Sequence, residues 1–145
     1  MLVNNILDSI NSLLTIAQHK VYLKYVNVLE PFDLTPGQYE VLHYLWLHKD
    51  QNSTPKSISD FLCLEFTSVS RMLDILQKKD LINRALNENN HRRIKVTTTK
   101  KSDALKEKLE KTIDILNKEI NKGLTKKDYD SLMKMLRMIS DIEEK

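Results

Sequence analysis

Residues 54–79 read TPKSISDFLCLEFTSVSRMLDILQKK, and this stretch decides the fold. Threonine caps helices and proline fits their first turn, so Thr-Pro predicts a short helix that ends at Leu62. After a turn at residues 63–65, a second helix is predicted from about Phe66 to Lys79. Its apolar residues recur at steps of three and four and form one inner face, which consists of Val69, Met72, Leu73 and Leu76.

A β-hairpin is predicted directly after the second helix. Its strands are residues 81–86 and 93–99, and the second strand alternates Ile94, Val96 and Thr98 with polar or charged neighbours. The turn between the strands has three asparagines, which tolerate positive φ better than most residues. Helix, turn, helix and hairpin in this order predict a winged helix-turn-helix.

Two helices are predicted upstream of this unit. The first runs from Leu2 to about Val28 and ends before Pro31, because a residue that precedes proline is pushed out of the helical region. The second starts at residues 35–38, which supply a threonine cap, a first-turn proline and the glutamine of a capping box, and it extends to about Leu47.

Two more helices are predicted downstream, one with apolar residues from Leu105 to Ile120 that ends at Gly123, and one capped by Thr125. The end helices carry more apolar surface than one small unit can cover, so we expect two chains to pack them together. The expected fold class is mainly α with a small β-hairpin wing. We expect a single compact domain with an N-terminal dimerisation helix, a winged helix-turn-helix and C-terminal dimerisation helices, over residues 1–30, 34–101 and 102–145.

The composition sets the class of protein. The chain has 145 residues, of which 41% are hydrophobic and 30% charged, which excludes a disordered tail. Two glycines, three prolines and few aromatic residues favour helices. The single cysteine excludes an internal disulfide, and no targeting segment or long apolar run is present, so we expect a cytoplasmic protein without a membrane partner.

Enzyme and metal-site motifs are missing from the sequence. It has no glycine-rich phosphate loop, no nucleophile motif and no convincing carboxylate pair, so we expect no enzyme and no cofactor. The four histidines do not recur at the spacing of metal ligands, so we expect no metal site. They are His19, His43, His48 and His91.

Positive charge gathers in the middle of the chain. Residues 66–101 contain nine basic and three acidic residues, a net +6, whereas the whole chain is +3 and the remainder is therefore −3. Such a distribution is typical of a phosphate-binding unit carried on a scaffold, although an ordinary solvated surface is the alternative.

The start of the second helix of the pair carries side chains that could contact DNA. An α-helix fits the major groove, and hydroxyl and arginine side chains at its N-terminus can bond base edges. Here they are Thr67, Ser68, Ser70 and Arg71, which could alternatively only cap the helix and bind water. The basic hairpin tip suits the neighbouring minor groove.

Five stretches resemble MarR-type transcriptional regulators, namely residues 34–42, 58–74, 76–82, 90–92 and 96–99, and the likeness has no gap from Ile58 to Ser102. The resemblance implies a dimer that binds a pseudo-palindromic operator in double-stranded DNA, often as a repressor released by a small molecule or an oxidant. It assigns the DNA contacts to Thr67, Ser68, Ser70 and Arg71 and makes Arg92 the wing arginine. We expect three further DNA contacts from the basic segment, namely Lys78, Arg84 and Arg93. The alternative function is a winged-helix module that binds protein instead of DNA.

The chain departs from this family at four positions. Asn90 stands where the family usually has an aspartate that pairs with the wing arginine, and three junction glycines are replaced by Cys63, Asp80 and Ser102. We expect Asp80 to accept a left-handed conformation more readily than Cys63. We interpret Cys63 as a small buried hydrophobe, and the alternative is a redox switch in the turn that aims the reading helix.

Aromatic residues indicate where an effector could bind. Tyr22, Tyr39, His43 and Trp46 could line a pocket between the dimerisation scaffold and the winged helix-turn-helix of residues 34–101, here called the reading unit. Such a pocket would suit a small aromatic effector. Ordinary core packing is the alternative for the same residues.

Overall fold

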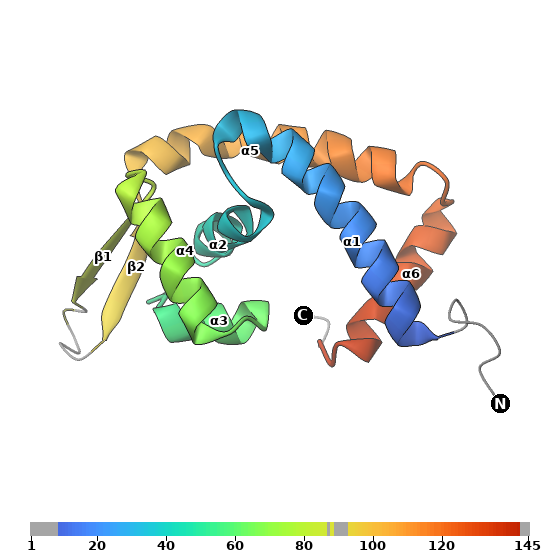
Figure 1. Ribbon diagram of the computed structural model, residues 1–145, viewed down its shortest axis with the longest axis horizontal. Coiled ribbons are helices and arrows are strands. Elements are labelled where there is room, and N and C mark those ends of the chain that lie inside the picture. The colour runs from blue at the N-terminus through green and yellow to red at the C-terminus, as the bar shows by residue number, and fades with distance from the viewer. Residues whose placement is uncertain (1–8, 87, 89–92, 143–145) are drawn as a thin grey trace.

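The computed structural model describes residues 9–86, 88 and 93–142. Within these residues it has six α-helices, a short 3-10 helix and a two-stranded antiparallel sheet (Figure 1). In chain order the elements are α1 (Ile10–Leu29), η2 (Glu30–Phe32), α2 (Pro36–Leu47), α3 (Pro55–Leu62), α4 (Phe66–Lys78), β1 (Ile82–Leu86), β2 (Ile94–Thr98), α5 (Lys100–Asn121) and α6 (Lys126–Ile139). The predicted winged helix-turn-helix with helices on both sides is confirmed.

The helix starts follow the predicted caps. At α2 the Thr35 hydroxyl accepts a hydrogen bond from the Gln38 N–H at 3.2 Å, and the Gln38 side chain accepts one from the Thr35 N–H, also at 3.2 Å. Thr54 and Ser57 form the same reciprocal pair at α3. Each pair satisfies two backbone donors that a helix start leaves free, which fixes where the helix begins.

The first helix ends where proline predicted it. α1 stops at Leu29, and Glu30-Pro31-Phe32 continues as a single 3-10 turn. The predicted start of this helix at Leu2 lies outside the described residues; within them, Ser9 caps α1.

The core lies in the reading unit and at its junction with α1 and α5. Its largest fully buried apolar side chains come from the end of α1, from α2, α3 and α4, from both strands and from α5, namely Leu29, Val41, Leu42, Ile58, Val69, Leu73, Leu76, Ile82, Val96 and Leu109. Burial of each such side chain contributes about 1.5–3 kcal/mol, so this cluster holds the reading unit together.

The other ends of α1 and α5, together with α6, form an arm that extends away from the reading unit (Figure 1). α6 has no buried residue, and large apolar side chains along it are exposed. In the part of the chain that the structure describes, none of the helices has the length and apolar character needed to cross a membrane.

The wing is attached to the reading unit through its backbone. β1 and β2 pair with Ile82 opposite Thr98 and Leu86 opposite Ile94. The Val96 N–H donates to the Ser53 carbonyl at 2.8 Å, which ties β2 to the loop before α3. Of the predicted hairpin turn, residues 87–90, only Glu88 lies within the described residues.

Two of the three junctions that lack glycine are left-handed. Cys63 ends α3 at φ 52°, and Asp80 follows α4 at φ 59°. The Cys63 side chain is exposed, so our interpretation of this residue as a buried hydrophobe is wrong. The reason is the conformation itself, because the left-handed residue turns the chain out of α3 at the surface. Ser102 is instead buried in the first turn of α5, where it pairs with the Thr99 cap.

Candidate nucleic-acid interface

The first turns of α4 present polar side chains to solvent. Thr67 and Arg71 are exposed, Ser68 and Ser70 are half-buried, and Val69 alone among residues 67–71 is buried in the core. The Glu65 side chain makes no capping hydrogen bond, so it leaves the first N–H groups of α4 available to a ligand. A helix start of this kind favours phosphate oxygens, because its free N–H groups and its dipole both face the anion.

A recess lies between the start of α3, the start of α4 and the wing. It has a volume of about 510 Å³, and its lining residues are Thr54, Pro55, Lys56, Ser57, Asp60, Phe66, Arg93 and Ile94. Its two cations, Lys56 and Arg93, come from different elements, and Lys56 also pairs with Asp60 at 3.4 Å. The arrangement offers cationic groups beside the exposed α4 start, as a DNA backbone requires.

Sequence reasoning missed Lys56 and Phe66 in this recess. Lys56 lies in the first turn of α3, two residues after the Thr54 cap. Phe66 is the first residue of α4, and 55% of its surface is exposed. The capping pattern before α3 could have indicated Lys56, because it already located that helix start. Nothing in the sequence separates Phe66 from a core aromatic residue.

Arg84 does not point freely to solvent. Its Nη2 donates to Asp74 Oδ1 at 2.6 Å and its Nε to Gln77 Oε1 at 2.6 Å, so the side chain connects β1 to α4. Lys78, next to Gln77, is exposed, and so is Arg93 at the foot of β2. Arg92, the predicted wing arginine, lies outside the described residues.

The cation after α4 is used internally. The Lys79 ammonium group bonds the Asp33 backbone carbonyl and lies 3.3 Å from the Asp33 carboxylate, which ties the end of α4 to the loop before α2. Lys101 donates to the Lys79 carbonyl at 2.8 Å. These two lysines stabilise the end of α4, whereas the side chains of Arg71 and Arg93 are exposed to solvent.

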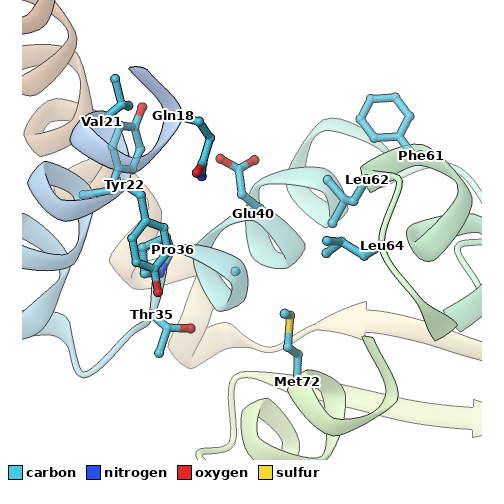
Figure 2. A pocket seen from close by; sticks show the side chains of 12 residues that line it. Gln18, Val21, Tyr22, Thr35, Pro36, Glu40, Phe61, Leu62, Leu64 and Met72 are labelled. Atoms are coloured by element: carbon cyan, nitrogen blue, oxygen red, sulfur yellow. The ribbon is translucent and has the colours of Figure 1, made fainter. Parts of the chain in front are cut away.

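A cavity of about 760 Å³ separates α1 from the reading unit (Figure 2). Its walls are one face of α1, the first turn of α2, the end of α3 with its turn, and Met72 of α4, which contribute Gln18, Val21, Tyr22, Tyr25, Thr35, Pro36, Gly37, Glu40, Phe61, Leu62, Leu64 and Met72. A side chain at Gly37 would come within 2.7 Å of the Met72 methyl group, so glycine lets α4 approach α2 closely.

Of the four residues predicted for an effector pocket, Tyr22 lines this cavity. Tyr39 and His43 are not among its lining residues, and their rings contact each other in a tilted arrangement with centroids 5.6 Å apart. The pKa of the buried Tyr39 phenol is raised by burial and by the charge of Glu40. Trp46 lies in the core, and its Nε1–H donates to Asp103 Oδ1 at 3.0 Å. The lining residues of α1 recur at helical spacing from Gln18 to Tyr25, which could have located this wall from the sequence.

Known proteins share this arrangement. Residues 34–94, which span α2 to the start of β2, match the MarR family. This part of the chain is similar to the MarR family, and the match is shorter than half of the chain. The matched residues run from the loop before α2 through the first strand of the wing. Within the described residues, no group of three or more histidine, cysteine or acidic residues could hold a metal ion.

Relatives of the chain are transcriptional regulators. The HTH-type transcriptional regulator YhbI of Bacillus subtilis is 40% identical over 84 residues, which cover 56% of this chain and 51% of YhbI. The match therefore spans only about half the length of that relative.

Two of the similar solved structures match over most of the chain. A cysteine-to-serine variant of MarR from E. coli in complex with operator DNA is 25% identical with a TM-score of 0.81, and covers 89% of this chain and 91% of its own. The MepR–DNA complex of S. aureus is also 25% identical with a TM-score of 0.83, and covers 92% and 98%.

Proposed function

We propose that the protein is a dimeric, sequence-specific DNA-binding regulator of MarR type, and that it represses transcription until a small molecule releases it. The observation that carries this proposal is the exposed start of α4, where Thr67 and Arg71 face solvent beside the cations Lys56 and Arg93. The relatives support it, because YhbI is a transcriptional regulator and the MarR variant and MepR were solved with DNA.

In this proposal α4 lies in the major groove and the wing lies against the neighbouring minor groove. Thr67, Ser68, Ser70 and Arg71 contact base edges or the adjacent phosphates. Lys78, Arg92 and Arg93 contact the backbone or the minor groove. The phosphate contacts make the affinity fall steeply with salt concentration.

The second copy of the chain packs on the arm. Exposed apolar side chains on α1 and α6 have no cover within the described chain, among them Ile10, Leu13, Met135, Met138 and Ile139. Burial of such a surface against a two-fold related copy removes it from water. A two-fold dimer places its reading helices on half-sites about one helical turn apart, so the operator is a pseudo-palindrome.

The release step uses the cavity between α1 and the reading unit. One wall belongs to the dimerisation arm, whereas Leu64 and Met72 belong to the turn and helix that meet DNA. An effector that binds there contacts both parts and favours the spacing of the reading helices that accommodates it. If this spacing differs from that of the operator grooves, binding of effector and binding of DNA oppose each other.

The test is a gel-shift assay on the DNA directly upstream of the gene, searched first for an inverted repeat. We expect the purified chain to shift this fragment and not a scrambled one, with log K falling linearly with log salt. Arg71→Ala is expected to reduce the preference for the specific fragment by about 1–3 kcal/mol. A protein-interaction module would show no salt-dependent DNA affinity, and that result would refute the proposal.

A further inference from the structure

The cavity between α1 and the reading unit has a charge of one sign. Of the described residues that line it, only Glu40 carries a formal charge at neutral pH, and the others are apolar, aromatic or neutral polar. Figure 2 shows the Glu40 carboxylate pointing into the space between Gln18 of α1 and Leu62 of α3. Among the described residues no lysine or arginine belongs to the lining, so no permanent cation of this wall faces the carboxylate.

The Glu40 carboxylate and its neighbours alter each other's pKa values. Partial burial raises the pKa of Glu40, and the charge of His43, one turn further along α2, lowers it. Burial raises the pKa of the Tyr25 phenol, and the negative charge of Glu40 raises it further. Glu40 of α2 and Tyr25 of α1 both line the cavity, so the carboxylate faces α1 across it.

The remaining walls favour an apolar body. Tyr22 and Phe61 present rings from opposite sides, and Leu62, Leu64 and Met72 complete the surface toward the reading unit. A volume of about 760 Å³ lies within the usual range of sites for small organic ligands. Aromatic faces also attract cations, because the ring quadrupole is negative above its plane.

We propose that this cavity binds an organic cation, with one protonated amine or amidine against the Glu40 carboxylate and an aromatic or aliphatic body against Tyr22, Phe61 and Met72. This proposal deepens the effector role given above by naming the chemical class of the effector. An aromatic carboxylate of the same shape is disfavoured, because its charge would face that of Glu40 with no cation between them.

The test compares two ligands that share their ring system, biphenylmethylamine and biphenylcarboxylate. Binding of each to the purified full-length chain is measured by isothermal titration calorimetry at neutral pH and moderate salt. We expect the amine to bind at least tenfold more tightly than the carboxylate. Glu40→Gln, which keeps the size and removes the charge, should weaken amine binding at least tenfold and should not weaken binding of the carboxylate.

Two further variants make the result decisive. Glu119→Gln removes the same charge from an exposed position of α5 outside the cavity, and it should leave amine affinity unchanged. Glu40→Lys should reverse the preference toward the carboxylate, and circular dichroism checks that each variant folds. Equal affinity for both ligands, no binding of either, or an amine affinity unaffected by Glu40→Gln would overturn the proposal. The assay contains no DNA, so failure here leaves the DNA-binding function intact, and failure of the gel shift leaves the cation site intact.

Discussion

The Arg84 guanidinium lies 2.6 Å from the Asp74 carboxylate and thereby joins the first strand of the wing to the reading helix. Gln77, one turn further along α4, accepts a second hydrogen bond from the same side chain at 2.6 Å. Only 25% of the Arg84 side chain is exposed. Because the three residues come from two elements that are otherwise joined by a short turn, this bridge sets the angle between the wing and the reading helix.

The Arg84–Asp74 ion pair predicts an effect on DNA affinity opposite to the one expected from net charge alone. Removal of an acidic side chain near DNA should strengthen binding if only the net charge matters. We expect Asp74→Ala to weaken DNA binding instead, by about 1 kcal/mol, because the wing is no longer held in place. A double-mutant cycle with Arg84→Ala, measured by fluorescence anisotropy, should give a coupling of about 0.5–1 kcal/mol. Tighter binding by Asp74→Ala would show that Arg84 acts without its partner.

Arg71 and Arg93 should differ in how they affect DNA binding. Arg71 projects from the exposed start of α4, so Arg71→Ala should cost about 1–3 kcal/mol on the specific sequence and little on random DNA. Arg93→Ala should weaken binding to all sequences alike and reduce the salt slope by about one. Salt titrations on specific and scrambled duplexes measure both quantities. The same loss on both duplexes for Arg71→Ala would place this side chain on the backbone.

The elements were predictable from the sequence because local rules determine them. Thr35 and Thr54 each precede proline and bond the third residue of their helix, and these contacts involve only neighbours in the chain. Helical spacing likewise placed Val69, Leu73 and Leu76 in the core. Such features depend on the order of residues and not on the tertiary fold.

Features that depend on tertiary contacts were not predictable. Arg84 was predicted only as a DNA contact, because its partners lie on another element and are brought to it by the hairpin register. Cysteine is among the residue types most often buried, which is why we interpreted Cys63 as buried. It is exposed because it ends α3 in a left-handed conformation at the surface. The charge of the cavity requires that Glu40 of α2 faces Gln18 of α1, and periodicity within one helix does not specify which helices face each other.

Cys63 predicts a stabilising substitution. A left-handed conformation costs a residue with a side chain about 1–2 kcal/mol, and glycine avoids this cost but loses about 0.5–1 kcal/mol through its more flexible unfolded state. Cys63→Gly should therefore raise the free energy of unfolding by about 0.5–1 kcal/mol in urea denaturation. Asp80→Gly at the equivalent junction should gain less, because aspartate tolerates φ 59° better. A lower stability for Cys63→Gly would mean that the thiol makes a contact of its own.

Asp103 predicts how stability depends on pH. Burial alone would raise the pKa of this carboxyl group, but hydrogen bonds from Thr98, Trp46 and Lys49 and the charge of Lys49 outweigh it and hold the pKa below its usual 3.8. A carboxyl group with a lowered pKa in the folded state stabilises the fold above its unfolded pKa, and this contribution is lost as pH falls through the folded value.

Asp103→Asn keeps an oxygen for Trp46 and removes the charge, so it isolates this effect. It should lower the free energy of unfolding by about 0.5–1 kcal/mol near neutral pH, a modest value because the side chain is one-third exposed. The difference from the unsubstituted chain should shrink as pH falls below 3.8 and vanish below the folded pKa. Denaturation followed by Trp46 fluorescence at several pH values measures it, and a constant difference would contradict the assignment.

The arm predicts how the dimer can be separated. Met135 and Ile139 lie one turn apart on α6 and are 53% and 56% exposed in the single chain, so in the proposed dimer they lie between the copies. Met135→Asp would place two carboxylates in an apolar interface and should weaken dimerisation by about 2–4 kcal/mol. Lys126→Asp introduces the same side chain at an exposed position on the opposite face of α6, two and a half turns from Met135, and should leave the dimer intact. Sedimentation at several concentrations distinguishes the two variants. If Met135→Asp stays dimeric, the copies meet elsewhere; if it is a folded monomer, it should also lose the operator affinity that depends on two linked half-sites.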